Sequence, residues 1–129
     1  MMRRRILIAD DQPKLLERVS ELIATEHDVV GAVGDGDAAV AAAESLHPDL
    51  VILDISMPGM NGFEAARRIS AHDPAPRIMF LSVHEEADFL EAARQAGAVG
   101  YVLKRSIAGD LLPAIRLVLD GHAVFPTTV

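Results

Sequence analysis

Two kinds of apolar pattern alternate along this chain, and this alternation is the feature that most constrains its fold. Short runs rich in Val, Ile and Leu are typical of buried strands. Between them lie longer segments in which apolar residues recur at about every third or fourth position, which is typical of amphipathic helices. Regular alternation of strand and helix predicts a parallel sheet. Because the strand runs are almost continuously apolar, both faces of that sheet are expected to be buried.

The pattern predicts five strand-helix units and therefore an open doubly wound α/β sheet. The strands are expected at residues 5–9, 29–33, 50–54, 77–82 and 99–103. The first helix is expected to begin at Pro13, and the others to cover residues 37–46, 62–71, 86–96 and 106–120. Gly97 is expected to end the fourth helix, and Pro113 falls inside the fifth, where it would remove one backbone donor. In such sheets ligands bind beyond the carboxyl ends of the strands.

Length and composition exclude several classes of function. A chain of 129 residues is near the usual size of one domain. No apolar run approaches the ~20 residues of a membrane span, and residues 1–11 do not form a secretory signal, so we expect a cytoplasmic protein without membrane contact. The absence of cysteine excludes disulfides and thiolate chemistry. A formal net charge of -7 with only two lysines argues against direct nucleic-acid binding.

Chemically active side chains stand at the carboxyl ends of four predicted strands. Asp10 and Asp11 follow the first strand, and Asp54 ends the third. Ser82 ends the fourth, and Lys104 follows the fifth. Because the strands are parallel, all five side chains are expected at one edge of the sheet. Three neighbouring carboxylates repel one another unless a cation compensates, and oxygen ligands favour a hard divalent ion such as Mg²⁺.

This grouping predicts phosphoryl-transfer chemistry. Asp54 follows a buried strand that holds its backbone in place, so its carboxylate can act as a nucleophile toward phosphorus. Lys104 would place a positive charge near the oxygens of the transferring group, and the Ser82 hydroxyl would hydrogen-bond one of them. Taken alone, an aspartate or serine at a strand end usually forms a turn or a helix cap, and a lysine is usually solvated. The meeting of all five at one edge favours the chemical interpretation.

Four segments of the chain form a recognisable set, namely residues 6–11 (ILIADD), 53–62 (LDISMPGMNG), 81–82 (LS) and 100–104 (GYVLK). Together they resemble the receiver-domain family of bacterial two-component response regulators. The resemblance covers essentially the whole chain. Residues 81–85 and 96–101 are most similar to the NarL/FixJ subfamily, whose members usually carry a C-terminal helix-turn-helix domain. The resemblance implies a five-stranded flavodoxin-like sheet with strand order 2-1-3-4-5.

The resemblance also implies roles for individual residues. Asp11, Asp54 and the main-chain carbonyl of Ser56 would bind Mg²⁺ directly, while Asp10 would act largely through water. Asp54 would accept a phosphoryl group from a sensor histidine kinase, and Lys104 would direct its charge at that group. The chain would be a phosphoacceptor signalling domain and not an enzyme, although it would assist its own phosphorylation and dephosphorylation.

Ser82 and Tyr101 would form the switch of such a domain. The Ser82 hydroxyl would move toward the phosphoryl group, and the Tyr101 ring would rotate inward behind it. A charge change at Asp54 would thereby remodel the surface formed by the fourth helix and the fifth strand. A homodimer formed on phosphorylation is one expected outcome of this remodelling.

The expected domain organisation is one receiver at residues 1–121, followed by the start of a linker at residues 122–129. In NarL/FixJ regulators the corresponding linker leads to the DNA-binding domain, which would be absent from this segment. The favoured interpretation is therefore the N-terminal receiver of a transcriptional regulator. The alternative is a stand-alone receiver that acts through protein contacts.

Two other classes of protein use similar parts. A hydrolase of the haloacid dehalogenase type also has a strand-end aspartate nucleophile and Mg²⁺, but it needs a second aspartate two residues later, where Ser56 stands. A flavodoxin-like binding module would need a phosphate loop after the first strand, where Asp10 and Asp11 would repel a phosphate. The sequence also lacks a glycine-rich loop ending in Lys-Ser or Lys-Thr, which a nucleotide-binding P-loop requires.

Overall fold

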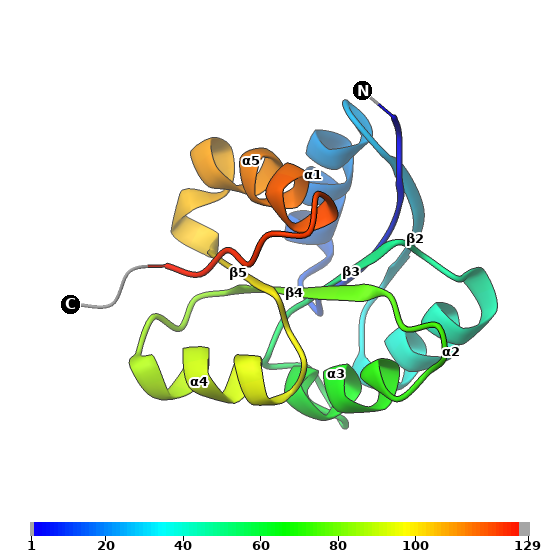
Figure 1. Cartoon of the computed structure of the whole chain (residues 1–129), viewed down its shortest axis with the longest axis vertical. Helices are drawn as coiled ribbons and strands as arrows, with labels where there is room; N and C mark the ends of the chain where they lie inside the picture. The colour runs from blue at the N-terminus through cyan, green and yellow to red at the C-terminus, as the bar shows by residue number, and fades with distance from the viewer. Residues whose placement is uncertain (1, 127–129) are drawn as a thin grey trace.

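The computed structural model describes residues 2–126, which form a five-stranded sheet between two layers of helices (Figure 1). The strands are β1 (Arg5–Ala9), β2 (Asp28–Val33), β3 (Leu50–Leu53), β4 (Arg77–Ser82) and β5 (Gly100–Leu103). Their order in the sheet is β2-β1-β3-β4-β5, and every neighbouring pair is parallel. The predicted doubly wound, flavodoxin-like architecture is therefore confirmed.

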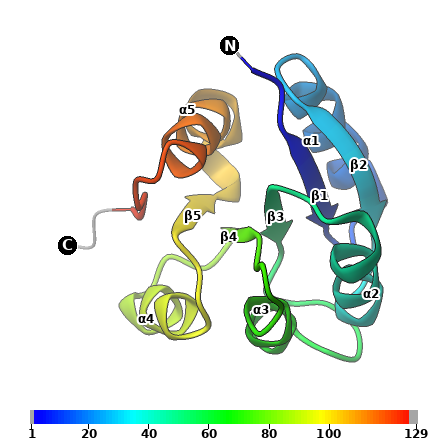
Figure 2. The same cartoon turned by 45° about the vertical axis from the view of Figure 1, so that its right-hand side comes forward.

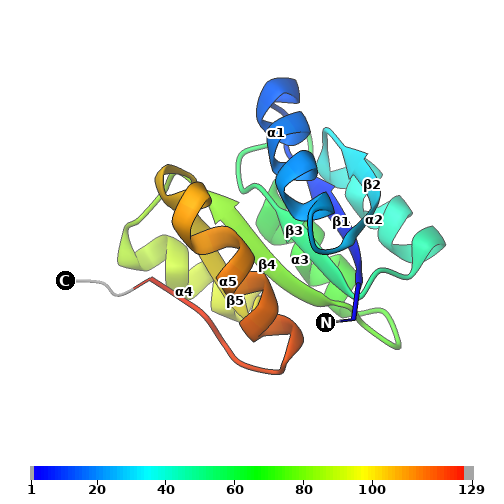
Figure 3. The same ribbon diagram turned by 90° about the horizontal axis from the view of Figure 1, so that it is seen from above.

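Helices cover both faces of the sheet, as Figures 1 and 3 show. They are α1 (Pro13–Ala24), α2 (Gly36–Leu46), α3 (Gly62–Ser70), α4 (Ala87–Gln95) and α5 (Ile107–Leu119). The first and the last of them cover one face, and the other three cover the opposite face. Among the described residues, no helix combines the length and the apolar character that crossing a membrane requires.

Strand side chains alternate between two apolar layers, and β3 shows this best. Leu50 and Ile52 pack in the layer under α1 and α5, while Val51 and Leu53 pack in the layer over the other three helices. All four residues are buried. The predicted burial of both faces is thus confirmed for the central strands, whereas the edge strand β2 is only partly buried. A central strand packed on both sides gives the residue that follows it a firmly held backbone.

Some predicted boundaries were wrong by one residue. The third strand ends at Leu53 and not at Asp54, although the Asp54 amide still donates to the Ala9 carbonyl at 2.9 Å. The second helix begins at Gly36 and not at residue 37, because Asp35 caps it by accepting a hydrogen bond from the Ala38 amide at 2.7 Å. The fifth strand begins at Gly100, one residue later than expected.

The helix ends follow the expected signals. Gly97 lies just past α4 with a φ of 101°, a left-handed conformation that glycine adopts without strain. His47 ends α2 with a φ of 49°, and Pro48 follows it. Pro113 lies inside α5, as predicted. A single 3₁₀ turn over Lys104–Ser106 leads into α5, so that helix begins at Ile107.

Residues 122–126 run back along the open edge of β5, as Figure 2 shows by the red segment beside that strand. Val124 forms a parallel bridge with Gly100. This part of the expected linker is therefore packed against the domain. Residues 127–129, which were also expected to belong to the linker, lie outside the described residues.

Gly62 begins α3 and lies against the backbone of Asp54. A Cβ atom at this position would stand 2.0 Å from the Asp54 carbonyl oxygen, far inside van der Waals contact. The Gly62 amide also donates to the Ile55 carbonyl at 2.8 Å. Only glycine therefore lets the loop after β3 fold back closely enough to start α3 here.

Gly62→Ala is expected to lower the free energy of unfolding by about 1–3 kcal/mol, because the added methyl group must displace backbone. The matched control is Gly109→Ala in α5, where a Cβ meets nothing within 4 Å. That variant is expected to gain about 0.5–1 kcal/mol, because alanine favours a helix more than glycine does. Urea denaturation followed by circular dichroism measures both changes, and equal effects of the two substitutions would contradict this account.

Candidate functional site

Three aspartates meet at the carboxyl edge of the sheet. Asp10 and Asp11 follow β1, Asp54 follows β3, and one carboxylate oxygen of each lies within 4.8 Å of the others. Within residues 2–126 this is the one group of acidic or histidine side chains close enough to hold a metal ion. Asp10 and Asp54 are buried, and Asp11 is exposed. The predicted convergence of the three carboxylates is therefore present.

Lys104 compensates the two buried carboxylates. Its Nζ lies 2.8 Å from Asp10 Oδ2 and 3.3 Å from Asp54 Oδ2, and its side chain is only 11% exposed. The contact with Asp10 is an ion pair that lacks the direction of a good hydrogen bond. Removing the shared lysine of such a buried group typically costs about 3–5 kcal/mol, because both carboxylates are then left without a partner of opposite charge.

Backbone amides hold the other oxygens of the buried carboxylates. Asp10 Oδ1 accepts a hydrogen bond from the Gln12 amide at 2.9 Å, and Asp54 Oδ1 accepts one from the Ile55 amide at 2.8 Å. Each carboxylate thus has one oxygen fixed by the chain and one directed at Lys104. Ser56 is an exposed residue two positions past Asp54, in the loop that follows β3 at the same edge of the sheet.

The environment of Asp54 disfavours its charged form. Burial raises the pKa of the Asp54 carboxyl above its ordinary value, and repulsion from Asp10 raises it further. The positive charge of Lys104 opposes both effects but does not cancel them. One lysine facing three carboxylates leaves an excess of negative charge, so the site favours an additional cation.

Ser82 and Tyr101 are joined through the main chain of His84. The Ser82 hydroxyl oxygen accepts a hydrogen bond from the His84 amide at 3.1 Å, and the Tyr101 hydroxyl donates to the His84 carbonyl at 2.7 Å. The Tyr101 ring is in the inward position, with 1% of its surface exposed. Burial raises the pKa of Tyr101, which keeps its hydroxyl a proton donor. The His84 ring stacks on Phe89, with 4.0 Å between the ring centroids.

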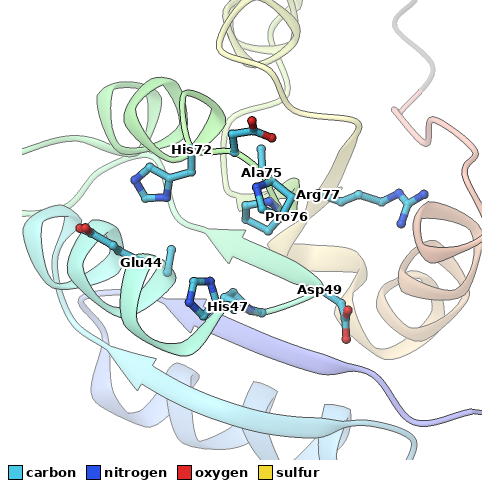
Figure 4. A pocket seen from close by; sticks show the side chains of 11 residues that line it. Glu44, His47, Asp49, His72, Ala75, Pro76 and Arg77 are labelled. Carbon is cyan, nitrogen blue, oxygen red and sulfur yellow. The ribbon is translucent and has the colours of Figure 1, made fainter.

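A hollow of the described surface lies away from this site. It has a volume of about 720 Å³ and opens where β3 and β4 begin, at the edge of the sheet opposite the aspartates (Figure 4). Its lining includes Glu44, His47, His72 and Arg77, and it contains none of the predicted site residues. The candidate site is thus defined by the meeting of strand ends and not by this hollow.

Sequence reasoning located the aspartates and the lysine but missed two supporting features. The close approach of Gly62 to Asp54 could have been sought, because a glycine that starts a helix near a functional residue suggests tight backbone packing. The role of the His84 main chain carried no signal, because any residue can supply an amide and a carbonyl. Among the described residues, no hydrogen bond joins Ser82 to Asp54, and the expected contact of Ser82 with an oxygen of the phosphoryl group stays a prediction.

Comparison with known proteins gives a consistent result. The sequence matches the response regulator receiver domain family over residues 6–116. It is 41% identical over 118 residues to the transcriptional regulatory protein PdtaR of Mycobacterium tuberculosis, and the aligned region covers 91% of this chain and 57% of the relative. It is 39% identical over 121 residues to the nitrate/nitrite response regulator protein NarL of Escherichia coli, and the aligned region covers 92% of this chain and 56% of the relative.

A solved structure agrees as well. The crystal structure of a two-component response regulator of the LuxR family from Aurantimonas superposes with a TM-score of 0.91 at 34% identity, over 95% of this chain and 89% of that chain. The chain therefore belongs to the response regulator receiver domain family. It spans about half the length of the curated relatives it matches.

The raised pKa of Asp54 predicts a pH-dependent effect of Asp54→Asn on metal-free stability. In the folded state the neutral carboxyl is favoured, so its stabilising effect is complete below the ordinary pKa of 3.8 and is lost as the pH rises through the folded pKa. Because asparagine is always neutral, the variant is expected to be more stable than the parent at pH 7, with a gain that shrinks toward pH 3.

Thermal unfolding between pH 3 and 8 with a chelator present measures this difference. Glu17→Gln, on the exposed face of α1, is the control, and its effect is expected to stay small at every pH. A gain for Asp54→Asn that is constant across the range would contradict the assignment of Asp54 as a destabilised buried carboxylate.

Proposed function

We propose that this chain is a phosphoacceptor whose Asp54 takes a phosphoryl group from a sensor histidine kinase. The observation that carries the proposal is the convergence of three aspartates with Lys104 at the carboxyl edge of the sheet. Receiver domains of response regulators are phosphorylated by such kinases, and this chain belongs to that family. A buried, firmly held carboxylate next to a lysine fits this transfer.

The transfer needs little besides positioning and charge. One Asp54 carboxylate oxygen bonds to phosphorus while the bond from phosphorus to the kinase histidine nitrogen breaks, and that nitrogen keeps the electron pair. Lys104, 3.3 Å from Asp54 Oδ2, neutralises charge on the phosphoryl oxygens as they arrive. The Ile55 amide keeps the other carboxylate oxygen in place. Both groups are fixed before the donor arrives, which reduces the reorganisation that the transfer requires.

The acidic group fits Mg²⁺ by its chemistry. Three carboxylates within 4.8 Å offer hard oxygen ligands and an excess of negative charge. Asp11, Asp54 and the Ser56 main-chain carbonyl would hold the ion directly, and Asp10, already paired with Lys104, would act largely through water. When bound, the ion offsets the negative charge of the phosphoryl oxygens.

The contacts around His84 support a switch made of Ser82 and Tyr101. A phosphoryl oxygen that draws the Ser82 hydroxyl toward Asp54 pulls on the His84 amide bonded to that hydroxyl. The His84 carbonyl, which accepts from the Tyr101 hydroxyl, moves with it. Phosphorylation thereby acts on the Tyr101 ring through one segment of main chain, and it favours the inward ring.

The domain organisation and partners complete the proposal. We place the receiver at residues 1–121 and the start of the linker at residues 122–129, within a cytoplasmic transcriptional regulator of the NarL/FixJ type that dimerises on phosphorylation. This segment contributes signalling and no DNA contact, in keeping with its net charge of -7. It assists only its own phosphorylation and dephosphorylation and turns over no external substrate.

The central test is phosphorylation by acetyl phosphate, read by intact mass. The parent chain is expected to gain one phosphoryl group when Mg²⁺ is present, and Asp54→Asn is expected to gain none, because the amide is not a nucleophile. Asp54→Asn keeps the side-chain shape, so its circular dichroism should match the parent. An adduct that persists in this variant, or that forms equally well with the metal chelated, would refute the assignment of Asp54.

A second test separates the roles of Asp11 and Lys104 in metal binding. Asp11→Asn is expected to weaken Mg²⁺ binding by about tenfold or more, because it removes an anionic ligand. Lys104→Ala is expected to keep Mg²⁺ binding, because it removes no ligand and frees the carboxylates it covers. It should nevertheless slow phosphorylation. Calorimetric titration of Mg²⁺ measures the affinities, and equal losses in both variants would contradict these separate roles.

A further inference from the structure

The segment of residues 122–126, here called the C-terminal strap, forms backbone hydrogen bonds with the outer edge of β5. The Val124 amide donates to the Val99 carbonyl at 2.9 Å, and the Tyr101 amide donates to the Val124 carbonyl at 2.8 Å. An open strand edge exposes unpaired amides and carbonyls, and the strap satisfies those on both sides of Gly100. One of these two bonds comes from the proposed switch residue itself.

Phe125 of the strap packs between that residue and α4. Its ring centroid lies 6.4 Å from the ring centroid of Tyr101, with an angle of 30° between the planes. Phe125 also contacts Arg94, which lies in the last turn of α4. The Arg94 guanidinium carbon is 4.1 Å from the Phe125 ring centroid, which is cation–π geometry. The strap thus connects to β5 by its backbone and to α4 and Tyr101 by one aromatic ring.

Tyr101 therefore has contacts at both ends of its side chain and at its amide. The hydroxyl is held by the His84 carbonyl, which leads back to Ser82, and the ring packs on Phe80 inside and Phe125 outside. If the ring left the inward position, Phe125 would lose its aromatic neighbour, and the backbone bond between Tyr101 and Val124 would lose its support. The contacts run without a gap from Ser82 to the strap.

We propose that the C-terminal strap and the Tyr101 ring switch as one unit, so that strap docking stabilises the inward ring and the inward ring stabilises the docked strap. The coupling acts equally in both directions, because a free energy shared by two contacts is reciprocal. The link between the inward ring and phosphorylation rests on the function proposed above, whereas the coupling of ring and strap does not. Phosphorylation at Asp54 is thereby transmitted to the chain at Phe125.

The size of the coupling follows from the contacts involved. An aromatic pair shifts a two-state population by roughly two- to tenfold, and a partly exposed cation–π contact adds about two- to fivefold. Effects of this size change the fraction of docked strap without altering the fold. Phe125 is only partly buried, so its removal leaves the core intact.

The composition of the chain permits a direct test. Tyr101 is its single tyrosine, so labelling tyrosine with ¹⁵N and ¹³C gives the signals of one residue in the full chain. The Tyr101 amide bonds to Val124, so its hydrogen exchange measures strap docking. Three-bond couplings to Cγ of the same residue measure the χ1 rotamer and hence the position of the ring. Docking and ring position are therefore read in one sample.

The variants are Phe125→Ala and Arg94→Ala, each in metal-free protein. Phe125→Ala is expected to speed exchange of the Tyr101 amide on the order of tenfold and to lower the inward rotamer population, and Arg94→Ala to do the same to a smaller degree. His122→Ala is the control, because His122 belongs to the strap but its side chain is exposed. The hydrogen bond of His122 to the Leu117 carbonyl comes from the main-chain amide, which the substitution keeps. That variant should match the parent in both measurements.

Two results would overturn the coupling. In one, Phe125→Ala speeds amide exchange but leaves the χ1 populations unchanged, which means that the strap leaves without affecting the ring. In the other, neither measurement changes. Beryllium fluoride with Mg²⁺, a mimic of the phosphoryl group, tests the proposed function separately, since it should slow exchange of the Tyr101 amide in the parent and not in Asp54→Asn. A parent that fails to respond, with ring and strap still coupled, would count against phosphorylation and not against the coupling.

Discussion

The structure depends on the burial of two carboxylates beside one lysine at the end of a parallel sheet. Asp10 and Asp54 lose most of their contact with water, and Lys104 is their one close cationic partner among the described residues. The central strands hold these groups together, because β1 and β3 are paired in register and buried on both faces. The balance is incomplete, since the pKa of Asp54 stays raised. Stability is thus reduced at the site for which we propose binding of a cation and transfer of a phosphoryl group.

The same burial supports the proposed signalling role of the site. A charge change at a solvated carboxylate would be screened by water, whereas a change at Asp54 acts on neighbours that are packed and hydrogen-bonded. At the same edge of the sheet, hydrogen bonds join Ser82, the His84 main chain and Tyr101 in one line. Phe125 extends this line to the strap outside β5. In the proposed switch, a small displacement near Asp54 would reach the surface along this line.

Local sequence signals were most informative where the residue type itself determines the geometry. The positions of Gly97 and Pro113, and the start of α1 at Pro13, follow directly from the backbone restrictions of glycine and proline. Local sequence signals were least informative where the geometry depends on main-chain groups or on the close approach of distant segments. The contact of Gly62 with Asp54 and the packing of residues 122–126 on β5 both depend on segments that are distant along the chain. Residues 122–126 of the expected linker are packed against the domain for this reason.

The sequence alone determined the alternation of strands and helices. It also determined that aspartates, a serine and a lysine stand at the carboxyl ends of four of the strands. Both follow from short-range rules, namely side-chain periodicity and the fact that parallel strands end at the same edge. The tertiary structure alone decided which carboxylate oxygens face Lys104. It also decided that Tyr101 points inward and that the Phe125 ring packs against it. These features depend on distances of a few ångströms between residues far apart in the chain, and only the packed core fixes such distances.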